Sequence, residues 1–133
     1  MDHQEVSPEA VVKRFIRAFA EYDYDKMAEC LADNALFHIT TADGGSKLVH
    51  GGDAFIASVR QMDIKTVQPL VKITQILSVR DDQVLLMIEI KAERKSRKLH
   101  NFAAYLVEVD DGKISHMHMV EALPAYSDSF WND

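Results

Sequence analysis

The N-terminal part of the chain shows the spacing of an amphipathic helix. Its apolar positions recur at intervals of three and four residues and would share one helical face: Val12, Phe15, Ile16 and Phe19. Ser7 and Pro8 stand just before this stripe. They predict where the helix starts, because a serine hydroxyl caps an orphan amide and proline suits the first helical position.

Two further helices are predicted downstream. One begins at Asp23, packs Met27, Cys30 and Leu31, and ends at the turn Asp33-Asn34. Residues 35–41 have the pattern of a strand, and a polar loop follows over residues 42–46. The other helix starts at Gly51-Gly52 with Asp53 as its cap, and its buried face comprises Phe55, Ile56, Val59 and Met62.

The second half of the chain alternates between apolar and polar positions. This alternation predicts strands at about 69–80, 82–93, 98–110 and 113–121. Tight turns are indicated by Arg80-Asp81-Asp82 and Asp110-Asp111-Gly112. Helices followed by a run of adjacent strands predict an α+β domain, in which an antiparallel sheet curls over the helices.

Two of the predicted strands are apolar on both faces. In residues 101–106, Asn101, Ala103 and Tyr105 lie on one face, and Phe102, Ala104 and Leu106 lie on the other. A sheet that helices cover on one side needs a partner for its other side. We therefore expect a homodimer through the outer face of the sheet. The alternative is that the segment Leu123–Trp131 folds back over that face.

Composition limits the classes of function. The 133 residues suit one domain, 1–133, and 15 basic against 21 acidic side chains give a net charge of −6, which argues against a nucleic-acid partner. No apolar run approaches about 18 residues, so no membrane span is expected. The lone Cys30 excludes an internal disulfide, and the polar N-terminus is unlike a signal peptide. We expect a cytoplasmic protein.

Several short segments follow one another in a familiar order: Phe15–Ala20, Tyr22–Met27, Leu31–Ala35, Phe37–Ile39, Val49–Ile56, Asp111–Ile114 and Asp128–Trp131. Together they resemble the nuclear-transport-factor-two-like superfamily, and within it the SnoaL-like branch of polyketide cyclases and ketosteroid isomerase. The resemblance implies a cone-shaped domain whose curved sheet and helices enclose one apolar pocket. It implies metal-free proton transfer in the enzymes of the family and no cofactor, but the family also includes binding proteins without catalysis.

The ketosteroid isomerase pattern does not carry over residue by residue. Phe15 stands where that enzyme has a hydrogen-bonding tyrosine, and Ile39 stands where it has a catalytic aspartate. Tyr105 aligns with its second acidic donor. Since two of the three polar positions are apolar in this chain, steroid isomerisation by that mechanism is rejected.

Three residues are candidates for catalysis. Glu121 ends a strand whose alternating row Ser115, Met117, Met119 would face the cavity, where an apolar environment raises a carboxyl pKa and suits general acid–base chemistry. Tyr105 would donate a hydrogen bond to a substrate oxygen. His38 would relay a proton, although alternation with Phe37 and Ile39 points it to the back of the sheet. Each side chain also has a structural alternative: a solvated carboxylate, a buried tyrosine hydrogen bond, or a histidine at a dimer contact.

Other side chains would line or cap the pocket rather than react. They are large and apolar, with one amide among them: Phe15, Phe19, Phe37, Phe55, Met62, Asn101, Met117, Met119 and Trp131. As a set they favour an apolar small molecule as ligand. The pair His116-x-His118 suggests a metal, but alternation points Glu121 to the opposite face, so no metal site is predicted.

Two functions remain open from the sequence. One is a metal-free isomerase, cyclase or (de)hydratase acting on an apolar substrate. The other is a non-catalytic domain that binds a ligand or a partner protein. They differ in whether Glu121, Tyr105 and His38 converge on one point of the cavity.

Overall fold

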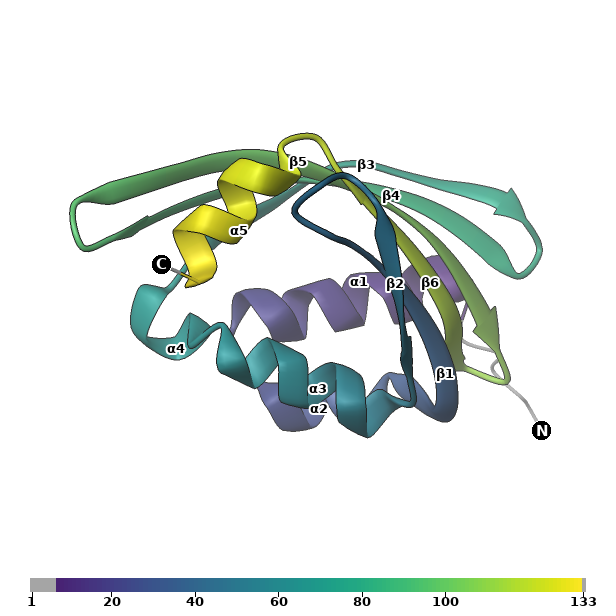
Figure 1. The fold of residues 1–133 in the computed structure, drawn as a ribbon. Helices are drawn as coiled ribbons and strands as arrows, with labels where there is room; N and C mark the ends of the chain where they lie inside the picture. Colours follow the sequence, from purple (N-terminus) through teal and green to yellow (C-terminus); the bar gives the residue numbers. More distant parts are fainter. Residues whose placement is uncertain (1–6, 133) are drawn as a thin grey trace.

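The structure is a computed structural model that describes residues 7–132 as helices packed against one curved sheet (Figure 1). The helices are α1 (Pro8–Ala20), α2 (Tyr24–Glu29), α3 (Gly52–Gln61), α4 (Ile64–Val67) and α5 (Pro124–Asn132). The strands are β1 (Leu31–Thr40), β2 (Ser46–His50), β3 (Leu70–Arg80), β4 (Gln83–Arg94), β5 (Arg97–Asp110) and β6 (Lys113–Glu121). This arrangement confirms the predicted α+β class.

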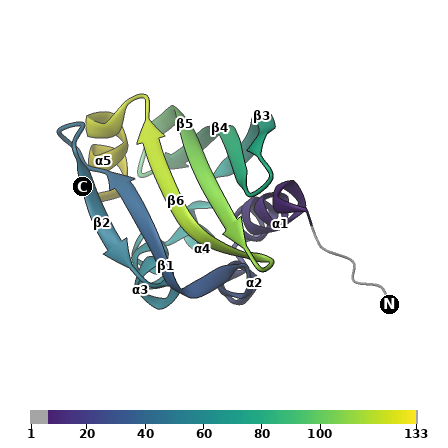
Figure 2. The same cartoon turned by 90° about the vertical axis from the view of Figure 1, so that its right-hand side faces the viewer.

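The sheet has the strand order β2-β1-β6-β5-β4-β3, and Figure 2 shows these strands with the helices behind them. Every neighbouring pair is antiparallel except β1 and β6, which run parallel. That pairing places the end of the first strand beside the end of the last one. The inner face of the sheet and the helices together form the hydrophobic core.

Local sequence explains how the first two helices begin. The hydroxyl of Ser7 accepts a hydrogen bond from the amide of Ala10 at 3.2 Å, and the carboxylate of Asp23 accepts one from the amide of Lys26 at 3.1 Å. Each cap satisfies an amide that the first helical turn leaves without a partner. Both starts are therefore where the sequence places them.

Other predicted boundaries are wrong. Helix α2 ends at Glu29, and Asp33 and Asn34 lie inside β1, where the register with β6 is irregular between Leu31 and Leu36. Strand β2 and helix α4 were not expected. Asp53 does not cap α3, because the cap position is Gly51, whose φ of 91° is accessible to glycine and strained for other residues.

The C-terminal segment forms α5 and does not cover the outer face of the sheet. Ser127, Asp128 and Trp131 of this helix line the cavity on the inner side. Large apolar side chains of the outer face stay exposed, among them Phe102 at 45% and Val120 at 59%. The alternative in which the tail shields this face is therefore excluded.

Candidate functional site

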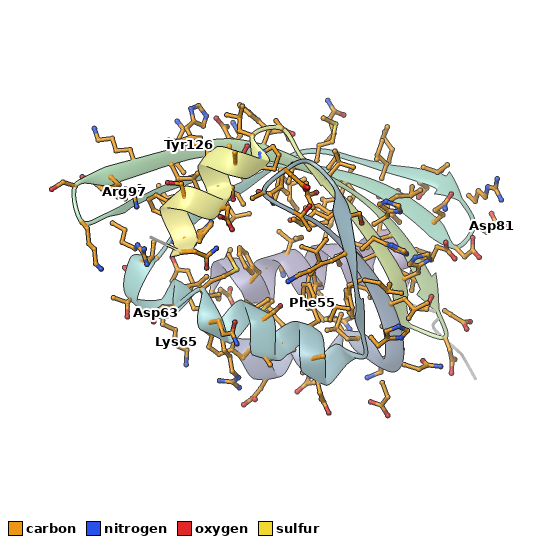
Figure 3. The ribbon with its side chains drawn as sticks, viewed as in Figure 1. Phe55, Asp63, Lys65, Asp81, Arg97 and Tyr126 are labelled. Carbon is orange, nitrogen blue, oxygen red and sulfur yellow. The ribbon has the colours of Figure 1, made fainter. Side chains whose placement is uncertain are left out.

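A cavity of about 380 Å³ lies between the inner face of the sheet, helices α1 and α3, and helix α5. This volume is within the usual range for small-molecule pockets, about 300–1,000 Å³. Much of the lining is aromatic or aliphatic, and in Figure 3 the labelled Phe55 projects inward from α3. The cavity thus lies on the side of the sheet that the helices cover.

Eight of the nine side chains predicted to contact a ligand line this cavity: Phe15, Phe19, Phe55, Met62, Asn101, Met117, Met119 and Trp131. Phe37 is the exception and corrects the prediction. Its side chain is fully buried and stacks on Phe55, with ring centroids 4.2 Å apart and planes 14° apart. Phe37 therefore packs behind Phe55, which lines the cavity.

Glu121 ends β6 and lines the cavity. One carboxylate oxygen, Oε1, accepts a hydrogen bond from Nδ2 of Asn101 at 3.0 Å, and the backbone amide donates to Oγ1 of Thr40 at 3.2 Å. Burial raises the pKa of the Glu121 carboxyl, and the charge of Asp128 adds to the rise. The side chains of Ser127 and Asn101 act in the opposite direction, because they stabilise the charged form.

Asn101 fixes the position of this carboxyl. Its side chain is 3% exposed, and its Oδ1 accepts a hydrogen bond from the amide of Leu123 at 3.1 Å. One amide side chain therefore joins Glu121 on β6 to the segment that leads into α5. The carboxyl and the helix that closes the cavity share this connection.

Tyr105 lies on the same face of the sheet as Glu121. In the pairing of β5 with β6, Ala103 is opposite Glu121 and Tyr105 is opposite Met119, so Tyr105 and Glu121 are diagonal neighbours. Such neighbours lie about 7 Å apart, which leaves room for a substrate atom between their polar ends. Burial raises the pKa of Tyr105, and the charge of Glu121 raises it further. Tyr105 is consequently a neutral donor.

His38 does not belong to this site, which corrects the third catalytic prediction. Its imidazole stacks on that of His118, with centroids 4.6 Å apart, and lies 5.0 Å from that of His116. These rings occupy the outer face, while Phe37 and Ile39 point inward. Strict alternation along β1 separates His38 from Glu121 by the thickness of the sheet.

Within residues 7–132, no cluster of three or more histidine, cysteine or carboxylate side chains has an arrangement that could hold a metal ion. In the same region no helix is long and apolar enough to cross a membrane.

Sequence reasoning missed several polar residues of the lining: Thr41, Lys47, Ser58, Gln61, Ser127 and Asp128. Ser127 and Asp128 matter most, since both affect the pKa of Glu121. They belong to α5, a helix that the sequence analysis treated only as a tail. The signal available was the proximity of Leu123–Trp131 to the end of β6, because a helix directly after Glu121 has to pack near it.

The sequence of residues 12–117 matches the SnoaL-like domain. The chain belongs to the SnoaL-like family. An uncharacterized protein of Mycobacterium tuberculosis is 26% identical to this SnoaL-like chain over 122 residues, covering 91% of this chain and 93% of its own. A protein of Mycobacterium bovis, also described as uncharacterized, matches to the same extent.

Solved structures share the SnoaL-like fold along most of the chain. Bal32a from a soil-derived mobile gene cassette has a TM-score of 0.80 at 20% identity, covering 94% of this chain and 97% of its own. A cystatin-fold protein of unknown function from Xanthomonas campestris gives 0.82 at 16%, covering 96% and 100%. An LEH-like epoxide hydrolase from M. tuberculosis gives 0.73 at 20%, covering 93% and 90%. At these identities the likeness concerns the fold.

Proposed function

We propose that this SnoaL-like protein binds an apolar small molecule in the cavity and catalyses metal-free acid–base chemistry there. The observation that carries the proposal is the convergence of Glu121 and Tyr105 on one cavity, with the carboxyl held by the buried Asn101. Isomerisation, cyclisation and hydration or dehydration are the reaction types that such a pair supports. The epoxide hydrolase among the structural neighbours is consistent with an enzyme on this fold.

The two side chains have complementary roles in the proposed reaction. Glu121 removes a proton from a carbon next to a carbonyl, while the Tyr105 hydroxyl donates a hydrogen bond to the carbonyl oxygen on which negative charge develops. The protonated Glu121 then returns the proton to carbon. A carboxyl whose pKa is raised is a stronger base than an exposed one and takes up a proton more readily, so the same group serves both steps.

Proton abstraction can be tested before the natural substrate is known. The protein is incubated in D₂O with a panel of neutral cyclic ketones, and deuterium uptake next to the carbonyl is followed by mass spectrometry. Glu121→Gln should abolish the catalysed uptake, and Tyr105→Phe should slow it about 100-fold. Glu89→Gln is the matched control, since this carboxylate lies on the outer face beside His100.

The position of His38 outside the cavity favours the alternative, a non-catalytic binding domain, which makes a different prediction. Trp131 is the chain's single tryptophan and lines the cavity, so its fluorescence reports occupancy. Titration with a neutral apolar dye such as Nile red should change that fluorescence in wild type and in Glu121→Gln. Binding without deuterium uptake from any ketone would favour the binding domain. Absence of binding would contradict both functions.

We also propose that two copies associate through the outer face of the sheet, with the cytoplasm as the compartment. Exposed apolar side chains on neighbouring strands support an association surface: Leu48, Leu77, Met87, Phe102, Leu106 and Val120. Leu106→Lys should give a monomer in sedimentation velocity. Ala57→Lys adds the same charge to an exposed position of α3 and should leave the association unchanged. A wild-type protein that sediments as a monomer would contradict the proposal.

A further inference from the structure

The histidines of the described residues 7–132 share one face of the sheet. His38, His116 and His118 form a contacting cluster, with ring centroids of His38 4.6 Å from His118 and 5.0 Å from His116. By register and alternation, His50 on β2 and His100 on β5 point to the same side. Glu121 and Tyr105 use none of these imidazoles.

The cluster lies within the apolar surface of the outer face. Along one row of the sheet, Leu106 is opposite His118, His118 is beside His38, and His38 is opposite Leu48. Leu106 is 39% exposed and Leu48 is 45% exposed. A partner that covers these two leucines must therefore also cover the imidazoles between them.

We infer that the outer face is a pH-gated interface, which binds a second copy of this chain while the histidine cluster is neutral and releases it when the cluster is protonated. This inference rests on the association put forward under Proposed function. It adds the trigger, which is protonation, and the residues that take up the proton.

The size and charge of the face fit a second copy. The five spacings between six strands, about 4.8 Å each, and a rise of about 3.3 Å per residue over ten residues give a face of roughly 800 Å². A standard interface buries about 800 Å² per partner. The chain carries a net charge of −6, yet two glutamates of this face, Glu89 and Glu108, each contact a histidine, and a third, Glu93, is paired across the strands with Lys98. Two copies of this face can therefore approach each other without strong repulsion between like charges.

Each charged or titratable group near the cluster can be placed by strand. His50 faces it from β2, His116 and His118 face it from β6, and Glu108 faces it from β5, 3.4 Å from Nδ1 of His116. Toward the other end of the same face lie His100, Glu89, Glu93, Lys91, Lys98 and Lys72. Among residues 7–132, Glu108 is therefore the acidic side chain that contacts the cluster, through His116.

Protonation of this cluster opposes contact with an apolar partner. A proton on His38 places a charge against two other rings, and burial followed by the charges of His118 and His116 lowers the pKa of His38. His116 directs Nδ1 toward Glu108, while its buried Nε2 has no hydrogen-bond partner among the described residues. A partner that covers this face would exclude water from the three rings, and Nε2 of His116 already lacks an acceptor in the described part of the chain, so a positive charge on the cluster would be poorly stabilised there.

Sedimentation velocity at about pH 7.5 and about pH 5, at equal ionic strength, tests the inference. We expect a dimer at the higher pH and a dissociation constant at least about tenfold larger at the lower one, reversible on return. The triple variant His38→Gln/His116→Gln/His118→Gln should dimerise equally at both pH values. His100→Gln is the matched control and should keep the pH dependence, because Glu89 compensates the charge of His100.

The outcomes separate the two proposals. A monomer at both pH values would overturn the association and this inference with it. A wild-type dimer that is equally tight at both pH values would overturn the gating alone. Dissociation that persists in the triple variant would assign the trigger to other groups and overturn the role of the cluster. Far-UV circular dichroism is recorded in parallel, and unfolding at the lower pH would also overturn the gating.

Discussion

The carboxyl of Glu121 lies in an environment that disfavours its charged form. Burial raises the pKa of its carboxyl, whereas the hydrogen bond from His100 lowers the pKa of Glu89 on the opposite face of the sheet. One chain thus contains two glutamates in strands whose pKa values shift in opposite directions. Ionisation of Glu121 and ionisation of Glu89 should therefore change the stability of the protein in opposite directions.

Glu121→Gln should raise the stability of the protein at pH 7. A raised folded pKa means that the ionised carboxylate costs stability above that pKa, and the cost disappears as the pH falls through it toward the unfolded value of 4.5. We expect the variant to melt roughly 2–4 °C higher at neutral pH and equally at acidic pH. Calorimetry across this range measures the difference. A lower melting temperature at neutral pH would contradict the assignment.

Glu89→Gln should behave with the opposite sign. A lowered folded pKa means that the carboxylate stabilises the protein above its unfolded pKa, and this contribution is lost as the pH falls through the folded value. The variant should therefore be less stable than wild type at neutral pH, with a difference that shrinks on acidification. The same calorimetric series provides the measurement, and a pH-independent difference would refute it.

Asn101→Ala should destabilise the protein by about 1–3 kcal/mol, because it removes the hydrogen-bond partner of a partly buried carboxylate oxygen and that of the Leu123 amide. Urea unfolding measures the change. Asn132→Ala is the matched control, since it removes one exposed hydrogen bond to Asp128 and should change the unfolding free energy by less than about 0.5 kcal/mol. Equal effects of the two variants would show that the Asn101 connection is unimportant.

At the scale of elements, the turn into α3 depends on one backbone conformation. Gly51 has φ 91° and ψ 146°, and its amide donates to the carbonyl of Ala35 at 2.7 Å. A Cβ added there would lie 3.2 Å from the carbonyl oxygen of Asp33, whereas one added at Gly44, which has φ 87°, would meet nothing within 4 Å. The two glycines share a backbone constraint and differ in the space around them.

Gly51→Ala should therefore cost more stability than Gly44→Ala. We expect a loss of about 2–3 kcal/mol at Gly51, where backbone strain and a tight contact combine, and about 1 kcal/mol at Gly44 from strain alone. Chemical denaturation of both variants in parallel gives the comparison. Equal losses would mean that the contact with Asp33 is relieved at no cost.

Alternation and order along the chain were enough to place the inward-facing residues. Met117, Met119 and Glu121 follow from a period of two on one strand, and Tyr105 follows from the same period on its neighbour. Phe37 and His38 do not line the cavity, and each has a physical reason. A residue can point inward and still be covered by a ring such as that of Phe55, and a chemically suitable imidazole cannot reach a pocket on the other side of its strand.

The elements that were missed are those with weak local signals. Strand β2 has five residues and helix α4 has four, so tertiary pairing and not local propensity determines them. Helix α5 has little amphipathic spacing and is held by contacts such as those of the Arg97 guanidinium with Ser129 and of the Tyr126 hydroxyl with the Lys98 carbonyl. Its polar contribution to the cavity could not be predicted for that reason.

At the scale of the whole molecule, the sheet has a protected centre and two open edges. Strand β5 is bonded on both sides, to β4 and to β6, while β2 and β3 are the edge strands. Native-state hydrogen exchange should therefore be slowest in β5 and at least about tenfold faster in β2. NMR detection of individual amides measures this order. Equal protection of β2 and β5 would mean that an additional strand pairs with the edge at β2.

The parallel pairing of β1 with β6 has a consequence for the synthesis of the protein on the ribosome. Strand β1 leaves the ribosome well before β6, which pairs with it. The paired residues Phe37 and Met117, for example, are eighty positions apart in the sequence. Until then the emerging chain has only the short β2 with which to pair, and its exposed backbone is open to wrong partners. Nascent-chain chaperones should therefore bind this polypeptide until its last strand has been translated.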